Sequence, residues 1–296
     1  MPGLSISTFS SVAVYTVLDL LGADALMRIA ASDVSVASRL FKSPRAARRW
    51  SPLAVAARYV ECRRSQALST DLRSSYLFNP LIILTCLGRP TSVFTTTFVL
   101  MATANACSGA SVGSAFALAM AAYNSLHPAL LLPPLTLLCH DQVVCRRKIV
   151  PPSSGDAQPS LGSFAFRHVS AFSIFVGLLL SLSFAMTQSW TFAHAVYGTR
   201  LLLPDLTPNV GLWWYFFIEM FDSFRNFFLG VFWLHMASYS PGLTIRLRQQ
   251  PLAAIVALCG IFSIFQPYAN IGDAGASMAM LGLYGHVFEC KQPMVL

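Results

Sequence analysis

Two long apolar segments, residues 164–189 and 211–238, constrain the fold of this chain more than any other feature. A helix needs about 20 apolar residues to cross the hydrocarbon core of a bilayer, and both segments exceed that length. Hydrophobic residues make up 55% of the 296 residues and charged residues 11%, whereas a typical soluble domain has about 25% charged residues. The sequence therefore predicts an all-α, polytopic transmembrane helix bundle, with residues 1–296 as a single integral membrane domain.

The number of crossings depends on four short apolar segments between residues 76 and 144. Breaks separate them at Gly88-Arg89-Pro90, at Ser108-Gly109 and at Leu126-His127-Pro128. Broken helices are tolerated in a membrane only where neighbouring protein or a cavity satisfies the freed backbone groups, so this region is expected to be buried among other helices. If all four segments cross, the chain has nine crossings, and if one pair is re-entrant it has seven.

Basic residues indicate the orientation. Nine of the 20 Lys and Arg residues fall within 39–73, and such residues concentrate in cytoplasmic loops. The loops 31–75, 145–163 and 239–250 are therefore predicted to be cytoplasmic, and 190–210 and 267–273 lumenal or external. Within this scheme 31–75 is a cytoplasmic basic segment, either an amphipathic helix on the membrane surface or a solvated linker. Because topology explains the net charge of +8, no nucleic-acid partner is expected.

An aromatic stretch at 204–228 carries ionisable residues inside an apolar segment. Such residues are costly within a membrane span and suggest a functional site. In one continuous helix from Val210, a single polar stripe would contain Tyr215, Glu219, Asp222 and Asn226. Arg225 lies within pairing reach of Asp222. The stripe therefore either holds neighbouring helices together or contacts a lipid headgroup or a partner subunit.

Two further candidates flank the spans. Asp205 and Asn209 precede the stripe at the predicted lumenal mouth, where Asp205 either caps a turn or accepts hydrogen bonds from an amine or a sugar hydroxyl. Arg146, Arg147 and Lys148 close a span at the cytoplasmic side. Each cation there favours anionic lipid by about 1 kcal/mol, although the ordinary excess of cytoplasmic basic residues also explains them and is the preferred explanation from the residues alone.

No catalytic set is apparent. The acidic residues form neither a DxD motif nor a paired-acid motif, and no nucleophile elbow lies near a histidine. Cys139, His140 and Cys145 lie close together in the sequence, but a metal site would need a fourth ligand. The residues therefore predict no catalytic residue, no metal and no cofactor.

Several motifs together resemble the family of U subunits of GPI transamidase. They occur in the family's order and spacing and are YLFNPLIILTC at 76–86, AYNSLHP at 122–128, AVYG at 195–198, PDLTPNVGLWWYFFIEMFDSF at 204–224 and YANIGDAG at 268–275. The long block at 204–224 is the most specific of them. The resemblance extends from about residue 10 onward and is weakest in 31–75.

The resemblance implies a noncatalytic, multi-pass subunit of the endoplasmic reticulum membrane with a glycosyltransferase-C-like architecture. Its complex attaches a preassembled GPI lipid to proteins, with the catalytic Cys and His in a caspase-like subunit. The implied partners are the other transamidase subunits, the GPI lipid and membrane phospholipid. The alternative is a polyprenyl-phosphate-mannose-dependent glycosyltransferase. Family members are longer at both ends, so a complete GPI site is not expected from this chain alone.

The resemblance also divides the candidate residues into two sets. Contact with the GPI lipid or a partner is expected for Asp205, Asn209, Tyr215, Glu219, Asp222 and Asn226. In the family, phospholipid lies near positions matching Lys148 and Arg225, so a phospholipid headgroup is expected at Arg146, Arg147, Lys148 and Arg225.

Overall fold

The computed structural model describes residues 6–32, 71–149, 160–202 and 208–284. Within these ranges the chain forms helices, turns and bends but no strand, which confirms the predicted all-α class. The first half contains α1 (Ile6–Ala31), α3 (Pro80–Gly88), α4 (Ser92–Cys107), α5 (Ser111–Asn124), the 3-10 helix η2 (His127–Leu131), α6 (Leu132–Ile149) and α7 (Leu161–Thr187). The second half contains α8 (Thr191–Ala193), the π-helix η3 (His194–Gly198), α9 (Thr199–Leu202), α10 (Leu212–Ile218), α11 (Asp222–Arg246), α12 (Pro251–Phe265), α13 (Ile271–Leu281) and the 3-10 helix η4 (Gly282–Tyr284).

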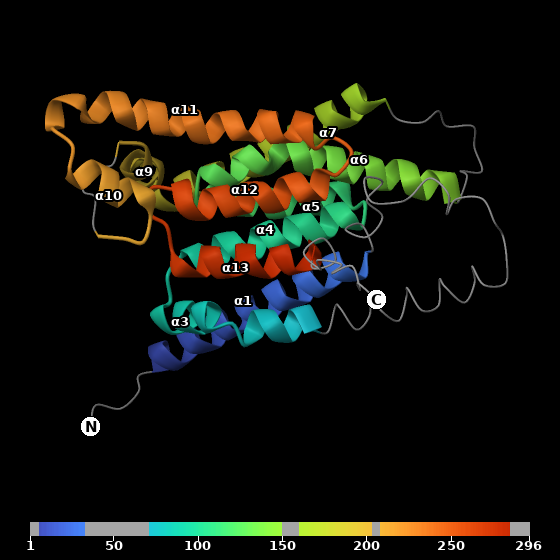
Figure 1. The fold of residues 1–296 in the computed structure, drawn as a ribbon, viewed down its shortest axis with the longest axis horizontal. Coiled ribbons are helices and arrows are strands. Elements are labelled where there is room, and N and C mark those ends of the chain that lie inside the picture. The colour runs from blue at the N-terminus through green and yellow to red at the C-terminus, as the bar shows by residue number, and fades with distance from the viewer. Residues whose placement is uncertain (1–5, 33–70, 150–159, 203–207, 285–296) are drawn as a thin grey trace, which may run out of the picture.

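The long helices lie side by side along the longest axis of the molecule (Figure 1). Their connections therefore gather at two ends. One end, here called the α9–α10 end, holds residues 88–92, 124–127, 188–202, 208–222 and 266–271. The two loops predicted to be lumenal, 190–210 and 267–273, contribute described residues to this same end, and the side of the membrane that it faces remains a prediction.

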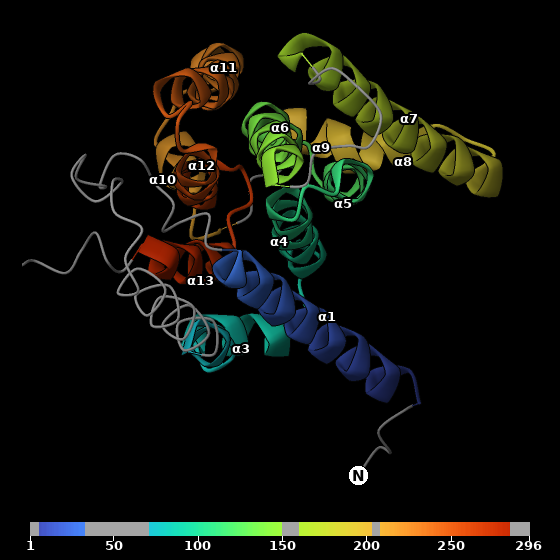
Figure 2. The same cartoon turned by 90° about the vertical axis from the view of Figure 1, so that its right-hand side faces the viewer.

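Two helical stretches of the described chain are long and apolar enough to cross a membrane, His127–Cys145 and Leu161–Thr187. Ser92–Cys107 and Pro251–Phe265 are apolar but shorter. The second stretch is the apolar segment predicted at 164–189, and as α7 it lies at the edge of the bundle, next to α5 (Figure 2). The count of seven to nine crossings remains a prediction.

The breaks between the short apolar segments lie where the sequence predicts them. α3 ends at Gly88, and Arg89 follows in the left-handed region with φ 49°. α4 ends at Cys107, and Gly109 has φ 72°, a conformation that glycine adopts without steric cost. Pro128 lies in the first turn of η2, where its missing N–H would have had no helical partner.

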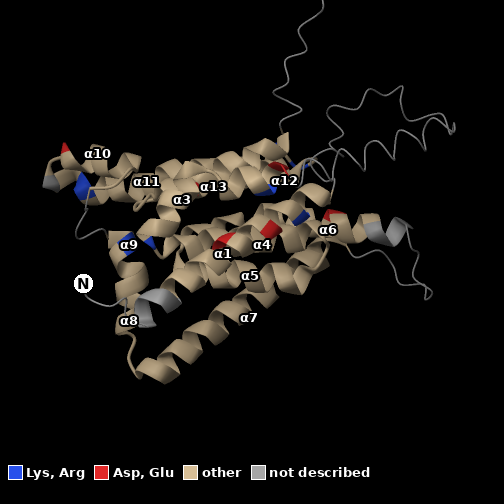
Figure 3. Cartoon of the chain, turned by 90° about the horizontal axis from the view of Figure 1, so that it is seen from below, with Lys and Arg blue, Asp and Glu red and all other residues tan. Residues whose placement is uncertain are grey.

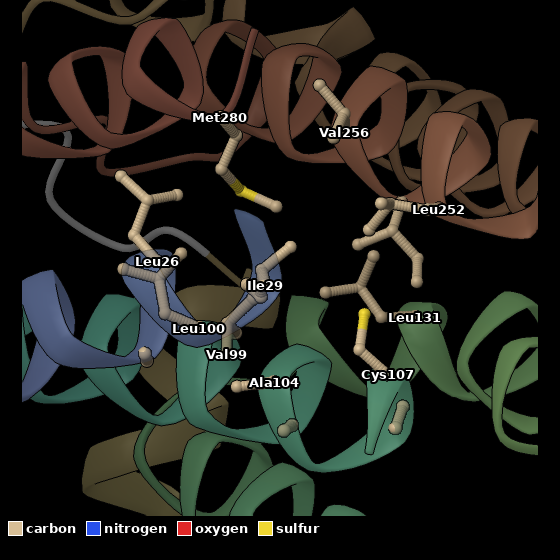
Figure 4. Packing of buried hydrophobic residues seen from close by; sticks show 14 of the residues in the cluster. Leu26, Ile29, Val99, Leu100, Ala104, Cys107, Leu131, Leu252, Val256 and Met280 are labelled. Atoms are coloured by element: carbon tan, nitrogen blue, oxygen red, sulfur yellow. The ribbon is translucent and has the colours of Figure 1, made fainter. Parts of the chain in front are cut away.

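One large hydrophobic core joins most of the described helices (Figure 4), and a smaller cluster around Trp213 and Leu229 joins α10 to α11. Leu26 and Ile29 of α1 pack with Leu100 of α4, and all three side chains are fully buried. The same core contains Ala104 of α4 and Ala121 of α5 at no more than 1% exposure. Such small residues let helix backbones approach closely, which is typical of packing between membrane helices.

The continuous helix predicted from Val210 is wrong. α10 ends at Ile218, and Phe221 is extended (φ −66°, ψ 139°) before α11 begins. The burial of Trp213 is the physical reason, because its fully buried ring packs at 5.1 Å from Phe232 and 5.7 Å from Trp233, both on α11. α10 must therefore fold back against α11, and the two helices form a hairpin.

Candidate functional site

A polar cluster joins α4 to α12 and α13 at the α9–α10 end; its members are Ser92, Thr96, Gln266, Asn270 and Asp273. The Thr96 hydroxyl donates to the Asp273 carboxylate at 2.7 Å, and the Gln266 amide donates to the other oxygen of the same carboxylate. Asn270 donates to the Ser92 hydroxyl at 2.7 Å. Side chains from α4 and from the adjoining ends of α12 and α13 thus form hydrogen bonds with the Asp273 carboxylate and with one another.

The backbone at the start of α13 sets the position of Asp273. Asn270 is extended (φ −116°, ψ 146°) and its carbonyl accepts the Asp273 N–H at 3.1 Å. An acidic residue in the first turn is also stabilised by the helix dipole. Gly272 lies so close to α3 that a Cβ there would be 2.6 Å from Thr85. The close contact with α3 leaves the carboxylate facing α4.

Arg200 brings a positive charge toward this cluster. It donates to the Ser125 hydroxyl at the end of α5, and that hydroxyl also lies 2.9 Å from His127 Nδ1. Burial lowers the pKa of Arg200, and the nearby Asp273 carboxylate opposes that shift. Arg200 therefore places a positive charge within electrostatic range of Asp273 at the α9–α10 end.

The space beside the polar cluster is small. A cavity of about 50 Å³ lies among α4, η2, α12 and α13, with Thr96, His127, Gln266 and Asp273 at its polar part. Small-molecule sites usually have about 300–1,000 Å³. The cluster therefore serves to hold the helices together in this structure, and a lipid does not fit inside it.

Asn209, one of the predicted contact residues, lies beside the polar cluster. Its amide donates to the Pro267 carbonyl at 3.1 Å and accepts the Gly211 N–H at 2.7 Å. A Cβ on Gly211 would be 2.9 Å from the Cβ of Ala269. Asn209 thus fastens the segment before α10 to the connection between α12 and α13.

The stripe predicted along one helix is divided between two. Tyr215 lies on α10 with 62% of its surface exposed, and the exposed Glu219 follows the last residue of α10. Asn226 is exposed on α11, whereas Arg225 is half-buried. The structure brings these residues to one hairpin but not into one helical row.

The remaining predicted residues are only partly described or lie outside the described ranges. Asp205 lies outside the described residues. Arg146, Arg147 and Lys148 lie on the last turns of α6 and Asp222 begins α11, but only their backbone is described. The basic segment 31–75 falls mostly outside, because residues 33–70 are not described. Figure 3 shows that charged residues are sparse along the described helices.

The sequence interpretation missed the polar cluster as a unit. One signal was present, because Asp273 is an ionisable residue at the start of an apolar segment, and such residues mark functional or structural sites. Its partners come from positions as distant as Ser92 and Thr96, so no local motif indicates them. Among the described residues, no three His, Cys, Asp or Glu side chains gather in a way that could hold a metal.

Comparison with known proteins identifies the family. A model of the family described as "GPI transamidase subunit PIG-U" matches residues 2–295. The chain belongs to the PIG-U family. The resemblance noted in the sequence motifs is thereby confirmed for almost the whole chain.

Proteins similar to this chain come from mammals and yeasts. The chain is 33% identical over 214 residues to "GPI-anchor transamidase component PIGU" of Mus musculus, covering 72% of this chain and 48% of the relative. It is 33% identical over 219 residues to "GPI transamidase component GAB1" of Saccharomyces cerevisiae, covering 72% and 50%. The chain spans about half the length of the curated relatives it matches.

Proposed function

We propose that this PIG-U family member is a noncatalytic, multi-pass subunit of a GPI transamidase in the endoplasmic reticulum membrane. In this role it supports recognition of the GPI lipid and assembly of the complex. Family membership over residues 2–295 is the observation that carries the proposal. The helical architecture, with apolar helices such as α7, is consistent with a membrane subunit.

The hairpin of α10 and α11 is the surface proposed to meet the GPI lipid or a partner subunit. Its tip exposes large apolar rings, with Phe221 79% and Phe227 67% exposed. Glu219 and Tyr215 place a carboxylate and a hydroxyl on the same exposed hairpin. Apolar rings beside polar groups suit the boundary between lipid tails and headgroups. Asp205, Asp222 and Asn226 are proposed to belong to this contact surface.

Asn209 is proposed to support the contact surface from behind. Both ends of its amide are engaged by protein atoms. Its side chain therefore positions the segment leading into α10, on which Tyr215 lies. Direct contact with the lipid is proposed for Tyr215 and Glu219 instead.

A phospholipid headgroup is proposed at Arg146, Arg147 and Lys148, which end α6, and at Arg225 on α11. The first three lie at the end of the bundle opposite α9 and α10, where cytoplasmic anionic lipid would attract them. Arg225 is half-buried near the start of α11, so its contact would be made at the other end of the bundle.

A pull-down of the tagged chain in mild detergent, followed by mass spectrometry, tests the subunit role. We expect a caspase-like protein and other membrane subunits to be recovered with it. A tagged unrelated membrane protein of similar size, expressed at the same level, is the control. Recovery of the folded chain without such partners would contradict the proposal and would direct attention to a lipid-linked mannosyltransferase.

A further inference from the structure

A second cavity, of about 10 Å³, lies where α1, α3, α4 and α13 meet (Figure 2). Thr96 and Asp273 of the polar cluster belong to its wall as well as to the wall of the cavity described above. The wall also includes the middle of α1, which brings a second carboxylate to this place. Its polar lining residues are Asp19, Tyr76, Thr85, Ser92, Thr96 and Asp273.

Asp19 is buried in α1 with few partners. Only 8% of its surface is exposed. In the part of the chain that the structure describes, the side-chain donor to its carboxylate is the Cys86 thiol of α3, and a thiol is a weak donor. Buried carboxylates are normally paired with a strong donor or bound to a metal ion, because an unpaired buried charge is costly. Asp19 therefore needs a further partner, and it faces the cavity.

The other polar groups of the wall offer oxygen lone pairs. The Thr85 hydroxyl donates to the Leu81 carbonyl at 2.7 Å, and the Thr96 hydroxyl donates to Asp273 at 2.7 Å. Each of these hydroxyl oxygens keeps lone pairs after its proton is engaged. Asp273 accepts from Thr96 and Gln266, and a carboxylate has about four acceptor positions. All three residues can therefore still bind a ligand through oxygen.

The wall has an excess of negative charge. Its described lining contains two carboxylates and four hydroxyls but no Lys, Arg or His. A Cβ on Gly22 would be 2.9 Å from the Tyr76 hydroxyl oxygen, so this hydroxyl lies against α1, one turn from Asp19. Arg200 is not part of this lining, and its guanidinium donates to Ser125. A ligand that suits the cavity must therefore be small and positively charged.

We propose that this cavity binds one Ca²⁺ ion, held between Asp19 of α1 and Asp273 of α13. Ca²⁺ takes six to eight oxygen ligands at about 2.3–2.6 Å, which is shorter than a hydrogen bond. A cavity at the lower limit for one water molecule therefore has room for the bare ion. Mg²⁺ usually keeps several of its waters, and the cavity has no room for them.

The proposed site differs from the metal sites that the sequence could have indicated. It has two acidic ligands from opposite ends of the chain, and hydroxyl oxygens complete the set. This composition is consistent with the absence of any group of three His, Cys, Asp or Glu side chains among the described residues. The inference goes beyond the proposed function and does not depend on a role in GPI attachment.

Thermal unfolding of the purified full chain in detergent tests the proposal. The protein is stripped with EGTA and then titrated with CaCl₂, with MgCl₂ and choline chloride at equal ionic strength as controls. An ion that binds only the folded protein raises the unfolding midpoint. We expect Ca²⁺ to do so with a half-maximal effect at about 10⁻⁴–10⁻³ M, and Mg²⁺ and choline to have no effect at these concentrations.

Two variants locate the ion. Asp19→Asn and Asp273→Asn each keep the size of the side chain and remove one charge from the wall. Because affinity for Ca²⁺ depends on the number of charged ligands, we expect each to raise the half-maximal concentration by about tenfold or more. Asp141→Asn, at an acidic residue of α6 with 53% of its side chain exposed, is the control and should respond as the parent does. The readout is the response to Ca²⁺, so a changed midpoint without Ca²⁺ does not affect it.

Three outcomes would overturn the proposal. The first is a midpoint of the parent that is the same in Ca²⁺, Mg²⁺ and choline. The second is a parental response to Ca²⁺ in folded Asp19→Asn, or in Asp273→Asn if Asp19→Asn does not fold, which would place the ion elsewhere. The third is an Asp19→Asn variant more stable than a parent that ignores Ca²⁺, which would indicate a protonated carboxyl instead of an ion. None of them would affect the pull-down of partner subunits.

Discussion

The hydroxyl of Thr96 on α4 donates a 2.7 Å hydrogen bond to the carboxylate of Asp273 on α13, across 177 positions of the sequence. This bond is part of the polar cluster that fixes the α9–α10 end. Thr96 and Gln266 each donate to one oxygen of this carboxylate. Loss of the Thr96 hydroxyl would therefore leave one oxygen of Asp273 without its side-chain donor.

We therefore expect Thr96→Val to destabilise the protein. Loss of a donor to this part-buried acceptor should cost up to about 3 kcal/mol, which should appear as a lower thermal unfolding midpoint in detergent. Thr187→Val is the matched control, because its hydroxyl is exposed and bonds only to nearby carbonyls of its own helix end. Its effect should stay within about 0.5 kcal/mol. Equal midpoints for the two variants would contradict the role of the polar cluster.

The fastening of the segment before α10 can be tested at Asn209. Asn209→Asp keeps the acceptor for the Gly211 N–H but removes the donor to Pro267, whereas Asn209→Ala removes both. We expect faster hydrogen exchange at 208–212 and 266–270, larger for Ala than for Asp, because these amides lose their anchor. Protection that matches the parent in both variants would show that Asn209 does not fasten this segment.

The contact surface on the α10–α11 hairpin can be tested with Glu219→Ala combined with Asp222→Ala. Removing two carboxylates from the hairpin tip should lower GPI attachment while leaving membrane insertion intact. The measurement is surface display of a GPI-anchored reporter in cells that depend on this chain, normalised to its expression. Asp141→Ala, an acidic residue on α6 with 53% of its side chain exposed, is the control. Normal display by the double variant would show that GPI attachment does not require the two carboxylates.

The phospholipid proposal can be tested with Arg146→Gln, Arg147→Gln and Lys148→Gln together. At about 1 kcal/mol for each cation, anionic lipid retained by the purified protein should fall clearly in native mass spectrometry. Arg246→Gln with Arg248→Gln removes basic residues near the end of α11 and shows the effect of charge alone. If the triple variant retains as much lipid as the parent, the three residues serve only as a topology signal.

The sequence predicted those features of the fold that depend on local chemistry. Helix breaks at Gly88, Gly109 and Pro128 follow from backbone preferences that one or two residues determine. The break between α10 and α11 has no such signal, since neither Gly nor Pro lies between Ile218 and Asp222. It results from the burial of Trp213 against α11, which is a tertiary effect.

The candidate site was predicted less completely than the fold. Glu219 and Asn226 were placed on one helix by their spacing, and the break separates them. The polar cluster could not be predicted, because Thr96 and Asp273 approach each other only when α4 and α13 pack together. In contrast, the resemblance of motifs such as YANIGDAG at 268–275 indicated the family without any knowledge of packing.

The long separation between Thr96 and Asp273 also has a consequence for biosynthesis. A ribosome that has just made Thr96 must add a further 177 residues before the carboxylate partner exists. At about 5–20 residues per second, this takes roughly 10–35 s. For that time Ser92 and Thr96 of α4 lack their final partners, and the polar cluster is complete only after the end of α12 and the start of α13 have been made.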